Sequence, residues 1–203
     1  MGKEALNVGI YVYDEAEVLD FSGPFEVFST ASRLSGGQPD FNVFLVSELG
    51  VPVRARGGFV VTPSFSIDHH PGLDVLIVVG GVHTAEMTKT PVLEWISRTS
   101  IDVSYIASVC TGAFLLAEAG VISGIRVTTH WEDIPDLRVR YPDLTVIENQ
   151  RWVDTGRIIT SGGISAGIDM SLHLVNRIAG RALAVATARQ MEFDWTENPA
   201  KPD

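Results

Sequence analysis

Residues 105–120 read YIASVCTGAFLLAEAG, and this stretch decides the fold. An apolar run suited to a buried strand ends at Val109, and a run of helical period begins at Thr111 and closes at Gly120. Cys110 is therefore predicted on a tight turn from strand to helix. Such a turn often strains the backbone, projects the side chain away from the sheet and faces it toward the amides of the following helix. These amides and the helix dipole are expected to lower the pKa of the Cys110 thiol.

Short apolar runs alternate with segments of helical period on both sides of this turn. The alternation predicts a flavodoxin-like, doubly wound α/β fold, with helices on both faces of a mainly parallel sheet. The run DVLIVV at 74–79 is apolar on both faces and is predicted at the sheet centre. The predicted strands are Asn7–Tyr13, Phe41–Ser47, Asp74–Val79, Val103–Val109, Arg126–Thr129, Thr145–Ile147, Arg151–Val153 and Arg157–Thr160, with an edge hairpin at Val53–Thr62. The first predicted helix starts at Ser22-Gly23-Pro24 and ends near Gly36-Gly37. The other predicted helices span Thr90–Thr99, Gly112–Ala119, Ile134–Arg140, Ala166–Ile178 and Leu183–Phe193.

The bulk composition is that of an ordinary globular protein. The 203 residues, 45% hydrophobic and 20% charged, suit one domain over residues 1–203. The polar, Pro-containing tail at 196–203 is expected to be loosely ordered. The formal charge of −10 would repel phosphate backbones and anionic lipids, so neither nucleic acid nor a membrane is an expected partner. No bilayer-length apolar run or signal-peptide layout is present, and a soluble protein of the cytoplasm is expected.

Cys110 is the single cysteine, so it forms no internal disulfide and no thiolate metal cage. It is either a buried small hydrophobic residue or a reactive thiol, and its place on the turn favours the reactive thiol. No two histidines have the i, i+4 spacing of a helical metal site. Neither a metal nor any other cofactor is expected.

Several residues are predicted to lie beside Cys110 because the carboxyl ends of parallel strands meet at one edge of the sheet. Gly112 is expected to let substrate approach the backbone, and Gly80 and Gly81 are expected to do so from the neighbouring strand end. Asp20 follows the first strand. It either donates a hydrogen bond as an acid, serves as a base for water, or merely caps the next helix.

Two further polar residues follow later strands. His130 is either a proton-transfer group facing the pocket or a satisfied structural histidine beside Trp131. The run TSGGISAG at 160–167 lacks the spacing of a dinucleotide or phosphate loop, and it is predicted to be a tight turn closing the pocket. Ser161 is its candidate polar contact.

Together these motifs resemble the ThiJ/PfpI superfamily, which shares the architecture of class I glutamine amidotransferases. The resemblance runs from Val8 to about Trp195. It is carried by VLDFSGPFEVF at 18–28, VVGG at 78–81, SVCTGAFLLAEAG at 108–120, VTTHW at 127–131 and TSGGISAGID at 160–169. Within the superfamily the chain looks most like the isonitrile hydratase branch, and also like the sensor half of some AraC-type regulators.

The resemblance implies roles for particular residues. Cys110 would be the nucleophile, Asp20 its acidic partner, and Thr111 a neighbour that supplies its backbone amide and its hydroxyl. Gly81 would supply the facing amide. Peptidase members carry Cys-His at the turn, whereas this chain has Cys110-Thr111, which argues against proteolysis. The resemblance also implies a homodimer.

Three functions follow as hypotheses. The first is cysteine-dependent hydration of a small isocyanide to an N-substituted formamide, without a cofactor. The second is glyoxalase or deglycase action on methylglyoxal-like aldehydes, because His130 matches a histidine near the cysteine of the deglycase group. The third is a metabolite or redox sensor without catalysis, because an exposed low-pKa thiol oxidises readily.

Overall fold

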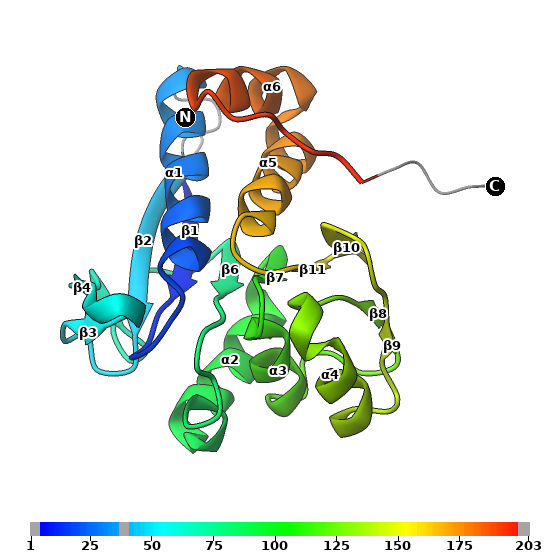
Figure 1. Cartoon of the computed structure of the whole chain (residues 1–203). Coiled ribbons are helices and arrows are strands. Elements are labelled where there is room, and N and C mark those ends of the chain that lie inside the picture. Colours follow the sequence, from blue (N-terminus) through cyan, green and yellow to red (C-terminus); the bar gives the residue numbers. More distant parts are fainter. Residues whose placement is uncertain (1–4, 37–40, 199–203) are drawn as a thin grey trace.

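The computed structural model describes residues 5–36 and 41–198. Its centre is a seven-stranded sheet in the order β10-β11-β7-β6-β1-β2-β5 (Figure 1). All neighbouring pairs are parallel except β10 and β11, which are antiparallel. The strands are β1 (Leu6–Tyr11), β2 (Phe41–Ser47), β5 (Phe65–Ser66), β6 (Val75–Val78), β7 (Tyr105–Ser108), β10 (Trp152–Asp154) and β11 (Ile158–Ser161). The prediction of a mainly parallel sheet is confirmed.

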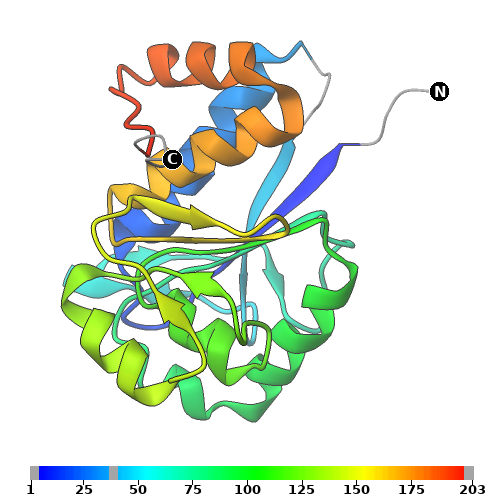
Figure 2. The ribbon, with the colours of Figure 1, turned by 90° about the vertical axis from the view of Figure 1, so that its right-hand side faces the viewer.

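Helices cover both faces of this sheet. Figure 2 shows α1, α5 and α6 on one side, and α2, α3 and α4 on the other. The helices are α1 (Val18–Leu34), α2 (Thr90–Asp102), α3 (Gly112–Glu118), α4 (Ile134–Arg140), α5 (Ala166–Ala179) and α6 (Arg181–Gln190), with short 3₁₀ turns η1 (Arg56–Gly58), η2 (Glu86–Thr88) and η3 (Trp131–Asp133). Because the sheet is covered twice, its central strands are buried on both faces; every residue of β6 is buried.

Two small sheets stand beside the central one. β3 (Val53–Arg54) and β4 (Val60–Val61) form the predicted hairpin as an antiparallel pair of their own. β8 (Arg126–Val127) and β9 (Thr145–Val146) pair in parallel with each other and do not join the central sheet. None of the described helices is both long enough and apolar enough to cross a membrane.

Helix α1 begins earlier than predicted. The sequence Ser22-Gly23-Pro24 suggested a helix start, but α1 begins at Val18 and contains Pro24 in its interior. A side-chain hydrogen bond stabilises the turn before the proline, because Ser22 Oγ donates to the Val18 carbonyl at 2.8 Å. Gly23 is needed for packing, because a Cβ there would lie 2.8 Å from Ile168 on α5. The earlier start places Asp20 inside the first turn of α1.

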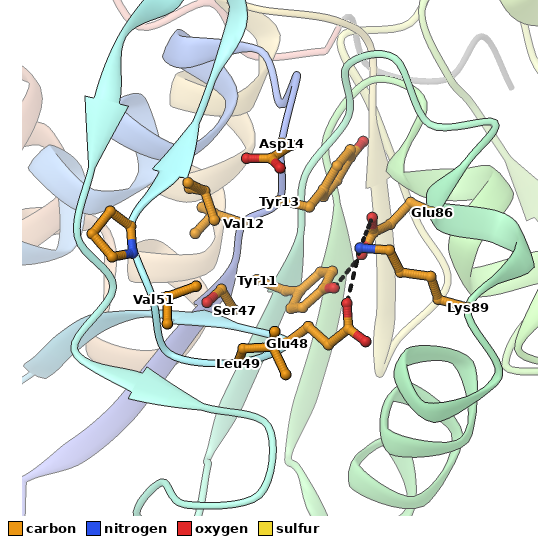
Figure 3. Close-up of a pocket in the computed structure, with 12 residues that line it drawn as sticks. Tyr11, Val12, Tyr13, Asp14, Ser47, Glu48, Leu49, Val51, Glu86 and Lys89 are labelled. Carbon is orange, nitrogen blue, oxygen red and sulfur yellow. Dashed lines mark hydrogen bonds and ion pairs between the residues drawn. The ribbon is translucent and has the colours of Figure 1, made fainter.

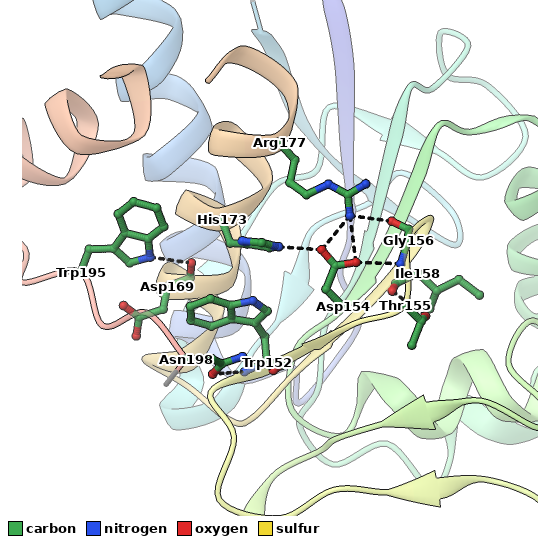
Figure 4. A network of polar contacts seen from close by, with 10 residues as sticks. All are labelled: Trp152, Asp154, Thr155, Gly156, Ile158, Asp169, His173, Arg177, Trp195 and Asn198. Carbon is green, nitrogen blue, oxygen red and sulfur yellow. Dashed lines mark hydrogen bonds and ion pairs between the residues drawn. The ribbon is translucent and has the colours of Figure 1, made fainter. Parts of the chain in front are cut away.

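The outer strand β10 is tied to α5 by a polar network (Figure 4). The Asp154 carboxylate accepts hydrogen bonds from Arg177 Nη1 at 2.7 and 2.8 Å and pairs with His173 Nε2 at 2.7 Å. Burial opposes ionisation of Asp154, but these partners outweigh it and lower its pKa to about 2. The network fixes α5 against the sheet edge, and Gly167 in the first turn of α5 packs against Val109, the residue before Cys110.

The described part of the C-terminal tail is also held against α5. The Thr196 amide donates to Asp169 Oδ1 at 2.7 Å, and Asn198 Oδ1 accepts from the Arg151 amide at 3.0 Å. The start of the tail is therefore hydrogen-bonded, in contrast to the expected looseness. The remaining residues of the predicted loose tail, 199–203, lie outside the described residues.

Candidate active site

Cys110 occupies the strained turn that the sequence predicted. It lies between β7 and α3 with φ at +55°, a left-handed value that is uncommon for residues other than glycine. Both of its backbone groups are held: its amide donates to the Gly162 carbonyl at 3.2 Å, and its carbonyl accepts from Thr129 Oγ1 at 2.8 Å. Surrounding structure thus fixes a conformation that would otherwise relax. The thiol is 7% exposed and borders a cavity.

Asp20 lies beside this sulfur and is fully buried. Its two carboxyl oxygens each accept a backbone amide: Gly80 N donates to Oδ2 at 3.0 Å, and Ile164 N donates to Oδ1 at 3.1 Å. The Cys110 thiol is a further hydrogen-bond partner. The residue before α1 makes no side-chain cap bond, and Asp20 reaches across to β6 and to the turn before α5. Asp20 therefore does not serve as the helix cap.

Burial controls the charges of this pair. It raises the pKa of Asp20 to about 7, although the amides of Gly80 and Ile164 partly oppose the rise. Burial, and then the Asp20 charge, also raise the pKa of the Cys110 thiol. The sequence predicted a lowered pKa for the Cys110 thiol, and this prediction is wrong for the protein without substrate. The Thr111 amide and hydroxyl favour the thiolate, but desolvation outweighs them. A proton on Asp20 removes the opposing charge.

Thr111 contributes two groups at the turn. Its backbone amide and its hydroxyl both act as hydrogen-bond partners of the Cys110 sulfur. The same hydroxyl accepts from the Gly81 amide at 3.0 Å and can donate to the Gly81 carbonyl at 3.1 Å. The structure thus places Thr111 against the sulfur and links it to the end of β6.

The three predicted glycines are needed for packing, and one of them, Gly81, also borders the Cys110 cavity. A Cβ on Gly112 would overlap the Val78 carbonyl oxygen, and one on Gly81 would overlap the Glu15 carbonyl oxygen. A Cβ on Gly80 would lie 2.7 Å from the Cys110 Cβ. The Gly80 amide is bonded to Asp20 and the Gly81 amide to Thr111.

The structure also corrects the assignment of Ser161 as a pocket contact. Ser161 is fully buried, and its hydroxyl donates to the carbonyls of Ser108 at 3.2 Å and Gly162 at 3.1 Å. Its hydroxyl thus links the last residue of β11 to the last residue of β7. It is absent from the residues that border the Cys110 cavity.

His130 does face the site and has an acidic partner that sequence reasoning missed. Its Nδ1 lies 3.3 Å from Asp133 Oδ2 and 3.8 Å from Glu132 Oε2. The imidazole contacts Gly163 from one side, and a Cβ on Gly163 would lie 3.3 Å from the Cys110 sulfur. His130 and the sulfur therefore flank the same glycine, and the His130–Asp133 pair can serve in proton transfer.

The cavity next to the sulfur has a volume of about 310 Å³. Besides Cys110 and His130 it is bordered by acidic and basic side chains and by two apolar residues, Val82 and Ile164. The members that sequence reasoning missed are Glu17, Arg56, Val82, His83, Thr84, Glu132, Asp133 and Ile164. Ile164 carries the clearest signal, since it lies in the TSGGISAG run predicted to close the pocket, and its φ of +56° is rare for a β-branched residue.

The fold and site together define an α/β protein whose single cysteine stands on a strained turn beside a buried carboxyl group. The sequence profile of the DJ-1/PfpI family matches residues 7–177. The chain belongs to the DJ-1/PfpI family, and the predicted ThiJ/PfpI resemblance is confirmed.

The sequence relatives include an isonitrile hydratase and a transcriptional regulator. The chain is 34% identical to an isonitrile hydratase from Pseudomonas putida, over 98% of this chain and 81% of that protein. It is 27% identical to the HTH-type transcriptional regulator GbdR of Pseudomonas aeruginosa PAO1, over 95% of this chain but 52% of the regulator. The chain thus spans about half the length of that regulator.

Solved structures agree on the fold. A ThiJ/PfpI family protein from Pseudomonas syringae superimposes with a TM-score of 0.83 at 24% identity, over 98% of this chain and 79% of that one. Drosophila melanogaster DJ-1beta gives a TM-score of 0.81 at 20% identity, over 95% of this chain and all of that one. These likenesses confirm the flavodoxin-like α/β fold.

Proposed function

We propose that this protein hydrates small isocyanides to N-substituted formamides, with Cys110 as nucleophile and Asp20 as the group that moves protons. The observation that carries the proposal is the buried Asp20 carboxyl beside the sulfur, whose pKa of about 7 suits both giving and taking a proton near neutral pH. The 34% identity to the isonitrile hydratase, over nearly the whole chain, supports the same substrate class.

The reaction begins with one proton shared between Asp20 and Cys110. With the proton on Asp20, the thiolate attacks the terminal carbon of R–N≡C and forms a carbon–sulfur bond. That carbon takes the Asp20 proton, which gives the thioimidate R–N=CH–S–Cys110. Asp20 is left as a carboxylate, and no oxidant or reductant is consumed.

Water completes the reaction. The Asp20 carboxylate takes a proton from water while the oxygen adds to the thioimidate carbon, and Asp20 passes this proton to the imine nitrogen. The tetrahedral adduct R–NH–CH(OH)–S–Cys110 then expels the thiolate to give R–NH–CHO, and the proton of its hydroxyl group returns to Asp20. The sum is one isocyanide and one water converted to one formamide. The Thr111 amide and hydroxyl, which contact the sulfur, stabilise it as it leaves.

Formamide production tests the proposal directly. Purified protein is incubated with alkyl and aryl isocyanides, and formamide is measured by chromatography against a heat-denatured sample. Intact-mass measurement during turnover should find an adduct of one isocyanide on Cys110. Formamide at only the uncatalysed rate with every isocyanide tried would contradict the proposal.

A methyl group on Gly163 should impair the site without replacing Cys110 itself. In Gly163→Ala the new Cβ would overlap the His130 ring and lie 3.3 Å from the sulfur, so we expect kcat/KM for formamide formation to fall about tenfold. Gly162→Ala is the matched control, since a Cβ there lies 3.5 Å from Ala166 in ordinary contact. Equal losses in both variants would contradict this reading of the pocket.

The His130–Asp133 pair favours a second candidate, glyoxalase action on methylglyoxal-like aldehydes. The thiolate would add to the aldehyde as a hemithioacetal, and His130, 3.3 Å from Asp133, would move the proton between the two substrate carbons. Lactate formed from methylglyoxal in a Cys110-dependent manner would favour this candidate, and its absence would reject it.

Further parts of the proposal concern the setting of the protein. We propose a homodimer in the cytoplasm that acts on a small-molecule substrate without a cofactor. The similarity to GbdR keeps a sensor role as a third hypothesis. Intact mass after mild peroxide treatment tests it, and an unmodified Cys110 would count against redox sensing.

A further inference from the structure

A second polar cluster lies at the end of β1, around Tyr11 (Figure 3). The Tyr11 hydroxyl donates to the buried Glu86 carboxylate. Lys89 Nζ bridges Glu86 Oε2 at 3.0 Å and Glu48 Oε2 at 2.9 Å. These groups border a small cavity of about 130 Å³, which Tyr13 also lines. In this cluster the polar atoms of Tyr11, Glu86 and Lys89 are partnered.

Tyr13 is the exception. It is 2% exposed, its ring stacks on Tyr11 with centroids 6.0 Å apart, and its hydroxyl has no hydrogen bond of good geometry among the described residues. A buried hydroxyl left in this state costs free energy, so it calls for an explanation. The neighbouring hydroxyl is that of Thr111, which acts on Tyr13 as a hydrogen-bond partner.

The charged groups around Tyr13 keep its proton in place. Burial raises the pKa of Tyr13 well above its usual value, and the charges of Glu86 on η2, Asp20 on α1 and Cys110 at the turn raise it further. The phenol therefore stays protonated at neutral pH. It can donate its hydrogen to an adjacent acceptor but does not itself become a base.

The hydroxyl of Thr111 has one hydrogen and two lone pairs. One lone pair accepts the Gly81 amide at 3.0 Å. If Tyr13 donates to the second, both acceptor positions are filled. The Thr111 hydrogen is then free to point to the Gly81 carbonyl, 3.1 Å away, or to the Cys110 sulfur. A negative sulfur is the stronger acceptor.

We propose that Tyr13 is a positioning residue whose hydroxyl donates to Thr111 Oγ1 and so fixes the Thr111 hydroxyl as a donor to the Cys110 thiolate. The inference rests on Cys110 as the reactive group, but it does not depend on an isocyanide as substrate. Tyr13 itself lines the cavity beside Glu86 and is absent from the residues that border the Cys110 cavity.

Alkylation of Cys110 by iodoacetamide as a function of pH tests this role. In Tyr13→Phe we expect the midpoint of the alkylation profile to rise by about half a pH unit to one unit, and the rate at pH 7 to fall about three- to tenfold. Tyr11→Phe is the matched control, because it removes a hydroxyl from the stacked neighbour that contacts Glu86. Its profile should match that of the wild type. Circular dichroism verifies that each variant is folded.

Variants at Thr111 separate positioning from a general effect on the core. In a Thr111→Val background Tyr13→Phe should cause no further shift, whereas in Thr111→Ser, which keeps the hydroxyl, the shift should remain. An unshifted profile in Tyr13→Phe, or an equal shift in the Thr111→Val background, would overturn the proposal. Because iodoacetamide replaces the substrate, failure of isocyanide turnover leaves this test unaffected.

Discussion

Replacing Cys110 with alanine should reduce formamide production by about 10⁴-fold or more, to the uncatalysed rate. The sulfur is the only thiol in the chain, and every covalent step of the proposed reaction passes through it. The adduct of one isocyanide, detected by intact-mass measurement of the wild type, should be absent from this variant. Since the side chain is small and alanine retains the Cβ, we expect the variant to fold, as checked by circular dichroism.

Ser108→Ala is the matched control for this variant. Ser108 lies on β7 two residues before Cys110, is fully buried, and its hydroxyl has no partner among the described residues. Removing that hydroxyl alters the same strand without altering the reactive group, so turnover should persist. Formamide production by Cys110→Ala at the wild-type rate would exclude the cysteine mechanism. The fold assignment would not be affected by that result.

The central strands and the reactive turn could be predicted from local sequence. The run at 74–79 is apolar on both faces, which suits a strand covered by helices on both sides, and β6 lies there. The change from strand to helical period around Cys110 predicted its turn, which the φ of +55° confirms. Both features depend on a few neighbouring residues.

The roles of the glycines and of Ser161 could not be predicted, because they depend on what another segment brings near. Gly112 is explained by the Val78 carbonyl on β6, which is distant in sequence. The Ser161 hydroxyl donates to the Ser108 carbonyl and does not face the cavity. Asp133 beside His130 was missed for the opposite reason, since its spacing of three residues carries no signal outside a regular helix.

The charge state of the cysteine also escaped sequence reasoning. A helix start lowers a thiol pKa when the sulfur is solvated, but here burial dominates and raises it. Burial is a property of the whole fold. The same burial gives Asp20 its pKa of about 7, so the proton of the pair is controlled by packing that no short motif encodes.

Asp20→Asn should separate sulfur reactivity from turnover. Asparagine cannot give or take the proton, so we expect formamide production to fall about 10²- to 10³-fold and to lose its dependence on a group titrating near pH 7. The Asp20 charge raises the pKa of the Cys110 thiol, and the variant lacks that charge. Alkylation of Cys110 by iodoacetamide should therefore be as fast as in the wild type or faster. Slower alkylation together with full turnover would contradict both roles of Asp20.

The same substitution should change how stability depends on pH. The carboxyl pKa is about 7 in the folded protein, against about 3.9 in an unfolded chain, so the folded state binds more protons between these values. Wild-type stability should fall as pH rises through this window, by up to about 4 kcal/mol. Asp20→Asn has no such group, so its free energy of unfolding should lack this fall, although its single amide oxygen cannot accept from both Gly80 and Ile164. Parallel pH profiles for the two proteins, measured by urea unfolding, would show that Asp20 is ionised throughout and cannot supply the proton that the thioimidate requires.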